Sequence, residues 1–549
     1  MIRLKGGRII DPANGRDEVG DLFIEDGHIV AAPNIPDSVK ETYDLSGKIV
    51  MAGGIDLHSH IAGNNVNLSR TLLLEQHPGM DPHPGHAPFS TAPWSTYETG
   101  RLYAEMGFTT VIEPALVAQG AVQAHLELAD IPYIDRGALA VLGNTDFLLK
   151  MLRDGEGNIS TDLLDDYVAW SIAATKCLGV KVVNAGGGAA FKENVRTFGL
   201  DDVVPSYGVS SRAIMQALIA SVNRLGIPHP LHVHCNNLGV AGESYITAIQ
   251  TMEAAGGLPI HLAHLQFYAY ASEGKRHFSS ASAFLAEAIS QHKNVTTDVG
   301  QVMFGQTVTL SGDVVRQYAS LSDARPKKTI LWDGDGTGGG IVPYAYKAKN
   351  YYNALQWAIG LELFLLIDDP WRVYFTTDHP NGAPFTTYPQ ILHLLMDAGE
   401  RAAWIARLPK KAMDMALLPQ LTREYSFYEI AIMSRAAPAR LLGLADRGQL
   451  GVGAAADISV YTEQADKTAM FSAADYVFKD GDLIVEGGKV KPYRWGRTHH
   501  LKPPKGSSQI DARLERYYAE QYGISAGAFA VPDAFNGGPS HFEVHPCRK

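Results

Sequence analysis

Between residues 51 and 429 the chain alternates short apolar runs with amphipathic stretches of helical length, and this alternation constrains its fold more than any other feature. Such a pattern is typical of parallel strands joined by crossover helices. Eight of the apolar runs are candidate strands, so the sequence predicts an α/β fold, a (β/α)8 TIM barrel. The candidate strands end at His58, Glu113, Gly143, Asn184, His234, His264, Asp298 and Asp378.

The two ends of the chain have a different texture, with short β-type runs broken by turns. Residues 1–50 contain Asp26-Gly27 between two such runs, and residues 430–495 contain Asp480-Gly481 in the same setting. An Asp-Gly pair between such segments favours a β-hairpin. The 549 residues also exceed what an ordinary barrel of about 250 residues needs. We therefore expect both ends to form one small β-sandwich domain beside the barrel.

Two further segments interrupt or extend this plan. Residues 299–370, which include a glycine-rich run near residues 333–340, predict an insertion within the barrel domain of residues 51–429. Residues 496–549 begin with a stretch that contains Pro503 and Pro504, which is typical of a linker. We expect this C-terminal extension to wrap the domain or to bind a partner.

The composition excludes several classes of function. A net charge of −11 and an isoelectric point near 6.0 give no overall attraction to nucleic acid or to anionic lipid. The first residues lack the apolar stretch of a signal peptide, and no later run reaches the ~18 apolar residues of a membrane span. We therefore expect a cytoplasmic protein. Three cysteines, Cys177, Cys235 and Cys547, are too few for a disulfide framework or a four-cysteine metal site.

The strongest chemical signal is a pair of histidines, His58 and His60, at the end of the first predicted strand. Residues two apart on a strand point to the same side, so both imidazoles can reach one metal ion. In a parallel barrel the carboxyl ends of the strands carry the active site, and this pair lies there. The alternative is that the two histidines are polar residues of the strand that bind no metal.

Four later residues occupy the same kind of position. Lys181 lies within the apolar run Val180 to Val183, where a charged amine is costly unless it is paired, neutralised or modified. His234 and His264 each end a strand that carries a second histidine, and we expect those second histidines, His232 and His261, to be hydrogen-bonded core residues. Asp378 ends the last strand and is placed for proton transfer. Taken singly, each position has an alternative: Lys181 extends to solvent, each histidine is a hydrogen-bonded core residue, and Asp378 is a solvated residue at a strand end.

The order of these residues resembles that of the amidohydrolase superfamily, in which an HxH pair, a carboxylated lysine, two histidines and an aspartate hold one or two divalent metals. Segments before and after the barrel also resemble that family, namely Lys48–Asp56, Ala437–Gly443 and Gly448–Asp457. The resemblance implies two zinc ions bridged by a carboxylated Lys181, with Asp378 as the proton-transferring residue. The implied metal ligands are His58, His60, Lys181, His234, His264 and Asp378.

Longer stretches resemble a narrower group, the hydrolase subunit of formylmethanofuran dehydrogenases and the alpha subunit of the formyltransferase/hydrolase complex. This resemblance implies hydrolysis of an N-formyl amide on a methanofuran- or methylofuran-type cofactor to formate and the free amine, or the reverse, in one-carbon metabolism. It also implies partner subunits of such a complex. The stretches are His58–Gly63, Tyr103–Thr110, Val183–Gly187, Cys235–Gly239, His264–Phe267 and Thr377–Gly382.

Four polar residues just beyond the ligand-bearing strands are candidate substrate contacts: Asn65, Asn67, Arg70 and Asn237. Ordinary hydrogen bonding within loops is the alternative for each of them. Two other functions use the same residues. A cyclic-amide hydrolase, such as a dihydropyrimidinase or a dihydroorotase, would share the metal site, and a catalytically silent scaffold subunit would keep the fold without the activity.

Overall fold

Eight parallel strands form the core of the barrel domain in the computed structural model, and consecutive strands pair along the sheet. A parallel bridge joins Ser59 to His379, so the segments after the first and eighth strands lie side by side and the sheet curls round on itself. The strands are β6 (Gly54–Asp56), β7 (Phe108–Leu116), β8 (Asp135–Leu142), β9 (Gly179–Val183), β12 (Leu231–His234), β13 (Ile260–Leu262), β16 (Val295–Asp298) and β20 (Val373–Tyr374).

The structure describes most of the chain, with several gaps. The described residues are 1–34, 38–73, 95–155, 161–311, 332–334, 339–491, 494–504, 508–532 and 541–548. Part of the expected glycine-rich insertion, residues 312–331 and 335–338, therefore lies outside them. The rest of that insertion forms an antiparallel sheet of β17 (Gly305–Ser311), β18 (Trp332–Gly334) and β19 (Gly339–Tyr346), followed by α11 (Tyr351–Leu366).

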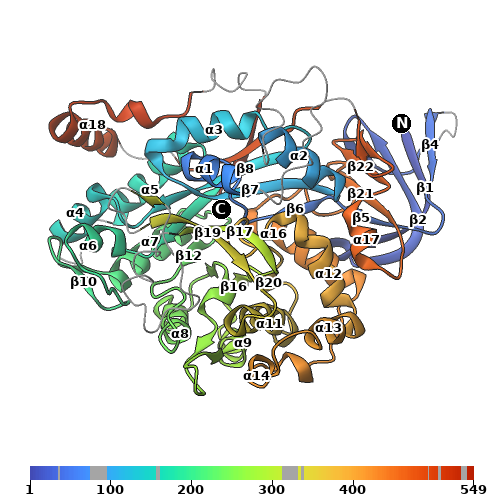
Figure 1. Cartoon of the computed structure of the whole chain (residues 1–549). Helices are drawn as coiled ribbons and strands as arrows, with labels where there is room; N and C mark the ends of the chain where they lie inside the picture. Colours follow the sequence, from blue (N-terminus) through green and yellow to red (C-terminus); the bar gives the residue numbers. More distant parts are fainter. Residues whose placement is uncertain are drawn as a thin grey trace.

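Amphipathic helices cover the outside of the barrel (Figure 1). In α7 the buried residues Ile214, Leu218 and Val222 recur every four positions, which gives the helix one apolar face. Its first turn is closed by the hydroxyl of Ser210, which accepts a hydrogen bond from the amide of Ala213. The main outer helices are α2 (Thr96–Glu105), α3 (Ala121–Ala129), α5 (Thr161–Thr175), α7 (Ser211–Arg224), α8 (Ser244–Ala254), α9 (Ser282–Gln291) and α12 (Tyr388–Met396).

The small domain is one sheet built from both ends of the chain, and Figure 1 shows its blue and orange strands side by side at the right. The two ends meet where β5 (Lys48–Ala52) pairs antiparallel with β21 (Ile458–Thr462). The other strands are β1 (Ile2–Asp11), β2 (Arg16–Glu25), β3 (His28–Val30), β4 (Glu41–Asp44), β22 (Tyr476–Lys479), β23 (Asp482–Glu486) and β24 (Lys489–Val490). The predicted α/β barrel with a small β-domain from both chain ends is thus confirmed.

Both Asp-Gly pairs form the hairpin turns that the sequence predicts. Asp26 and Gly27 connect β2 to β3 with φ values of 48° and 80°, and Asp480 and Gly481 connect β22 to β23 with φ values of 44° and 80°. Two successive residues with positive φ match the right-handed twist of the flanking strands.

The C-terminal extension adds two strands to the barrel sheet. Two residues of β25 (Thr498–Lys502) pair in parallel with β8, and β26 (Phe542–Pro546) pairs in parallel with β25. Between them lie α18 (Ser508–Tyr522) and a short 3-10 helix, η10 (Ala526–Phe529). The extension therefore shares a sheet with the barrel.

A buried cluster of charges joins these three parts of the chain, and we call it the junction cluster. Lys479 Nζ on β22 lies 2.9 Å from Asp135 on β8, 3.1 Å from Asp457 and 3.0 Å from Asp480. Arg447 lies 3.0 Å from Glu543 on β26 and 3.2 Å from Asp457. The cluster consists of Asp135, Arg447, Asp457, Lys479, Asp480 and Glu543.

Among the described helices, none is both long and apolar enough to cross a lipid bilayer.

Candidate metal centre and its cavity

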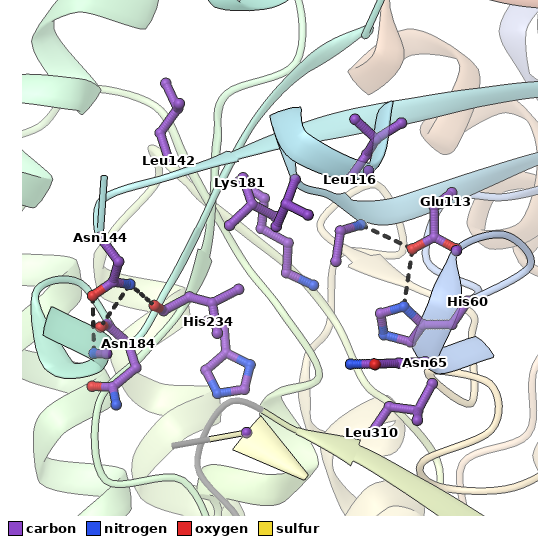
Figure 2. A pocket seen from close by; sticks show the side chains of 18 of the residues that line it. His60, Asn65, Glu113, Leu116, Leu142, Asn144, Lys181, Asn184, His234 and Leu310 are labelled. Atoms are coloured by element: carbon purple, nitrogen blue, oxygen red, sulfur yellow. Dashed lines mark hydrogen bonds and ion pairs between the residues drawn. The ribbon is translucent and has the colours of Figure 1, made fainter. Parts of the chain in front are cut away.

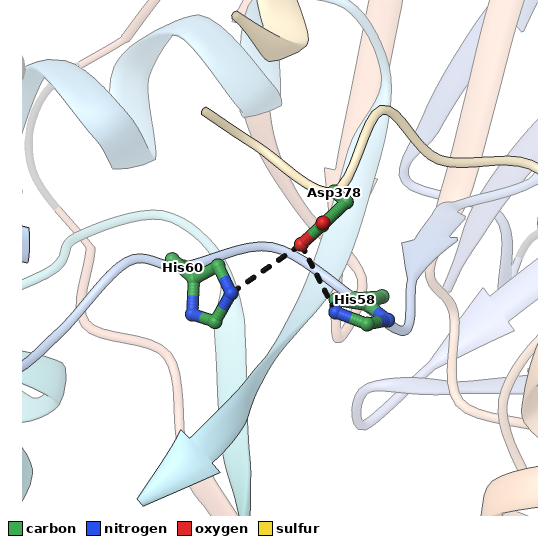
Figure 3. Close-up of side chains that lie close together, drawn as sticks. All are labelled: His58, His60 and Asp378. Atoms are coloured by element: carbon green, nitrogen blue, oxygen red, sulfur yellow. Dashed lines mark ion pairs between the residues drawn. The ribbon is translucent and has the colours of Figure 1, made fainter. Parts of the chain in front are cut away.

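His58, His60 and Asp378 converge at the carboxyl end of the barrel although they come from its first and last strands (Figure 3). The Nε2 atoms of His58 and His60 lie 3.1 Å and 3.3 Å from the same oxygen, Oδ1 of Asp378. No described residue donates a hydrogen bond to that oxygen. Three lone-pair atoms of such types around one point form a set of ligands that suits a divalent metal.

Two carboxylates from other strands fix the orientation of this histidine pair. His58 Nδ1 lies 2.8 Å from Asp298 Oδ2, and His60 Nδ1 lies 3.0 Å from Glu113 Oε1. Glu113 also accepts hydrogen bonds from the amides of Ile61 and Ala62. A proton held on Nδ1 by a carboxylate leaves the lone pair of Nε2 available, which is the usual arrangement of metal-ligating histidines.

Lys181 lies beside this pair and is only 2% exposed. Its Nζ is 3.2 Å from His58 Nε2, and Figure 2 shows the side chain pointing into the cavity. Burial lowers the pKa of its amine, although the charges of Asp378, Asp298 and Glu113 oppose that shift. The sequence predicts this placement because Lys181 is the one charged residue of β9.

His234 and His264 are the remaining predicted metal ligands, and they lie close to each other. His264 Nε2 lies 2.9 Å from His234 Nδ1, and the rings of His58 and His264 are 5.3 Å apart. Both His264 and Asp378 have positive φ values, 36° and 52°. Non-glycine residues in this region cost about 1–3 kcal/mol each and tend to cluster at functional sites. The structure thus brings all six predicted ligands to one end of the barrel.

A second observation also indicates that these ligand atoms suit a divalent metal. Nδ1 of His264 is buried without a hydrogen-bond partner among the described residues, and so is Oδ1 of Asp378. Burial raises the pKa of a carboxyl group, but the charges of His58 and His264 outweigh it and hold the pKa of Asp378 well below its usual value. A buried anion between imidazoles is stabilised when a cation binds there.

The two further histidines of these strands are core residues, as the sequence predicts. His232 is hydrogen-bonded to His229 and His58, and His261 is hydrogen-bonded to Thr296 and Asp298. Two more groups in the described chain have metal-ligand spacing. One is His58, His232 and Asp298, in which His58 is hydrogen-bonded to both of the others. The second is His499, Glu543 and His545. Its glutamate is already paired with Arg447, so the junction cluster accounts for that group.

A cavity of about 830 Å³ opens beside the predicted ligands. His60, Lys181, His234, His264 and Asp378 line its inner end, and Figure 2 shows Glu113 and Asn65 beside His60. The size falls within the range of about 300–1,000 Å³ that small-molecule sites occupy.

The four predicted substrate residues differ in their positions. Asn65 lines the cavity, whereas Asn67, Arg70 and Asn237 are absent from its described wall. Asn67 donates a hydrogen bond to Glu127 and accepts one from Arg70. Asn237 donates to Thr247. These three side chains thus have hydrogen-bond partners within the fold, and the substrate contacts of all four residues stay predictions.

Several residues of the site were missed at the level of sequence. Glu113 and Asp298 are named there only as strand ends, and Tyr346 from the insertion and Tyr517 from α18 line the cavity without any predicted role. Only Glu113 and Asp298 had a usable signal, because a carboxylate at the end of a barrel strand lies beside the ligands.

Comparison with known proteins shows the family of the chain. A model of the amidohydrolase family matches residues 41–485. FhcA, which belongs to the formyltransferase/hydrolase complex Fhc of Methylorubrum extorquens, is 49% identical over the full length of both chains. Protein FwdA of Methanocaldococcus jannaschii is 35% identical, with 95% of this chain and 96% of FwdA covered.

A solved structure gives the same result for the fold. In the crystal structure of the formyltransferase/hydrolase complex FhcABCD of Methylorubrum extorquens with methylofuran, one chain superimposes with a TM-score of 0.94. It is 48% identical, and both chains are covered completely. Because the family model spans most of the chain and two relatives match nearly its whole length, the chain belongs to the amidohydrolase family, in the group that contains FhcA and FwdA.

Proposed function

We propose that the chain hydrolyses the formamide bond of an N-formyl amine on a methanofuran- or methylofuran-type cofactor, or forms that bond in the reverse direction. The observation that carries the proposal is the convergence of His58, His60 and Asp378 beside a buried Lys181 at the end of a cavity. The full-length likeness to one member of a formyltransferase/hydrolase complex supports the choice of substrate.

The proposed metal is zinc, held as a pair of ions by the histidines, Asp378 and a carboxylated Lys181. Carboxylation joins CO₂ to the neutral amine of Lys181, and the resulting carbamate offers two oxygen ligands. A lysine that is 2% exposed and has one described hydrogen-bond partner is placed for this modification. Divalent ions bound there would polarise the formyl oxygen and lower the pKa of the attacking water.

A residue of the chain would then transfer the proton from the attacking water to the leaving nitrogen. Water adds its oxygen to the formyl carbon, the carbon–nitrogen bond breaks, and formate and a free amine leave. An amine departs readily only when it is protonated, so a group must carry the proton from the water to the nitrogen. We assign that role to Asp378, because its Oδ1 lies at the centre of the histidine pair and at the wall of the cavity.

The test of this assignment is Asp378→Asn. Asparagine is nearly isosteric but cannot relay a proton, so we expect the fold to persist while the rate of formamide hydrolysis falls by ~10²–10⁴-fold. Circular dichroism and formate release from an N-formyl aminomethylfuran measure the two outcomes. A variant that kept more than about a tenth of the activity would show that Asp378 is not the proton carrier.

The same assay separates the other two functions. Release of formate from the formyl aminomethylfuran, with no opening of hydantoin or dihydroorotate, supports the proposal over a cyclic-amide hydrolase. A purified protein that contains no metal and cleaves none of the three compounds would instead be a scaffold subunit.

A further inference from the structure

The cavity that begins at the predicted metal ligands ends on the C-terminal extension. Its outer wall contains Tyr517, Tyr518 and Tyr522 from α18, together with Ile524 and Phe529 from the segment that follows. In Figure 1 this segment lies at the far left, in dark red, away from the small domain. A segment outside the barrel repeat thus forms one side of the barrel's own cavity.

Contacts with the barrel domain hold this aromatic wall in place. The hydroxyl of Tyr517 donates to Asp146, the first residue of α4 (Asp146–Asp154), and its ring meets that of Phe147 at 5.1 Å. Leu514 is fully buried. The wall is therefore formed before any ligand binds, which reduces the entropy lost on binding.

A second contact fixes the residues after α18. Glu515 accepts hydrogen bonds from the hydroxyl of Ser525 and the amide of Ala526, at 3.0 Å and 2.9 Å. The rings of Tyr518 and Phe529 lie 4.8 Å apart. The segment from Ser525 to Phe529 consequently folds back on α18 and extends its aromatic surface.

The rim of the cavity leaves apolar side chains in water. Tyr522 is 57% exposed, Ile524 is 40% exposed, and Val117 from the barrel side of the rim is 49% exposed. Single exposed apolar residues are normal on a protein surface, but a group of them around one concave site indicates a ligand or a partner. All three line the same cavity as Lys181 and Asp378, which favours a ligand that reaches both ends.

We propose that α18 and the segment up to Phe529 bind the body of the substrate, an aromatic group joined to the formamide. This inference rests on the proposed function and adds the part of the substrate that lies away from the reacting bond. A cavity of about 830 Å³ is far larger than a formamide group requires. Tyrosine and phenylalanine rings favour planar aromatic ligands because offset stacking and edge-to-face contacts are both open to them.

The test uses two formamides and two variants. N-(4-benzyloxybenzyl)formamide carries an aromatic body, and N-ethylformamide carries none. For Tyr522→Ala and for Phe529→Ala we expect kcat/KM on the aromatic probe to fall about three- to tenfold, mainly through KM. The value for N-ethylformamide should change less than twofold. Glu520→Ala, an exposed change on the same helix, is the matched control and should change neither value.

A binding measurement keeps this test independent of catalysis. Calorimetric titration with 4-benzyloxybenzylamine should show a weaker Kd for both variants by the same factor, and an unchanged Kd for Glu520→Ala. If the wild-type chain cleaves neither formamide but the variants still weaken amine binding, the proposed function fails and this inference stands. Unchanged kcat/KM and Kd in both variants would overturn the inference. If those variants had also lost a protein partner, the surface would instead be a protein interface.

Discussion

Lys181 shows how much of the site depends on a single side chain. An ordinary lysine has a pKa near ~10.4, and its ammonium group repels metal dications and has no lone pair to donate. Here the side chain is buried against His58, and Asp378 is close enough to influence its charge. A carbamate would turn this residue from a source of repulsion into a bridging ligand.

Lys181→Ala should therefore lose both the bridged metal and the activity. Without the carbamate one shared ligand disappears, so we expect fewer bound metal ions than in the wild type, and addition of short carboxylic acids should partly restore both quantities. Elemental mass spectrometry and formate release measure them. Lys293→Ala, which removes an exposed lysine, is the control. Electron density for an unmodified amine beside two fully occupied metals would contradict the prediction.

The sequence indicated the predicted metal ligands but not the residues that contact them. The pair His58 and His60 could be predicted because a spacing of two on a strand is a local property. The partners of these histidines, Asp298 and Glu113, come from distant strands, and no local pattern indicates such a contact. The contact of Arg70 with substrate stays a prediction, and in the structure its guanidinium donates hydrogen bonds to Asn67 and to the carbonyl of Ile61.

At the scale of elements, the junction cluster connects the barrel, the small domain and the C-terminal extension, which are three separate segments in the prediction from sequence. Burial alone would lower the pKa of Lys479, but the charges of Asp135 and Asp457 raise it above its ordinary value, so the amine stays charged. This side chain is 0% exposed. Its contacts lie on β8, on the small domain and on the turn after β22.

Lys479→Met should reduce the free energy of unfolding by about 3–5 kcal/mol, because it removes one of the two buried cations of the junction cluster and leaves the charge of its carboxylates only partly offset by Arg447. Lys491→Met is the matched control, since its pair with Glu486 is 39% and 50% exposed and should contribute at most about 1 kcal/mol. Chemical denaturation followed by tryptophan fluorescence measures both. Equal effects of the two changes would mean that the cluster does not hold the three parts together.

The sequence could not predict the strands of the C-terminal extension. A (β/α)8 pattern is visible because eight strands alternate with helices, and an Asp-Gly turn is visible in four residues. In contrast, β25 and β26 are short strands separated by some forty residues, and the pairing of β25 with β8 and of β26 with β25 is a tertiary contact. From the sequence alone, the tyrosines of α18 are typical of an amphipathic surface helix. Their position in the cavity wall depends on tertiary contacts.

At the scale of the whole molecule, we propose that the chain works with other subunits, including a formyltransferase. The relative in Methylorubrum extorquens is named as part of a formyltransferase/hydrolase complex, and the likeness extends over both full chains. Purification of the native protein under mild conditions should therefore recover one-carbon subunits in fixed ratio, together with zinc. Recovery of a lone, metal-free and fully active chain would contradict this prediction.

The pairing of β5 with β21 has a consequence for synthesis of the protein. About 400 residues separate these strands. At ~5–20 residues per second, the ribosome needs roughly 20–80 s to make the second strand after the first. Until then the edge of β5 has no neighbour on that side, and an open edge of apolar residues such as Ile49, Val50 and Met51 is a template for intermolecular pairing. Chains that terminate before residue 458 keep this edge open permanently, so truncated translation products of this gene should be the ones that aggregate.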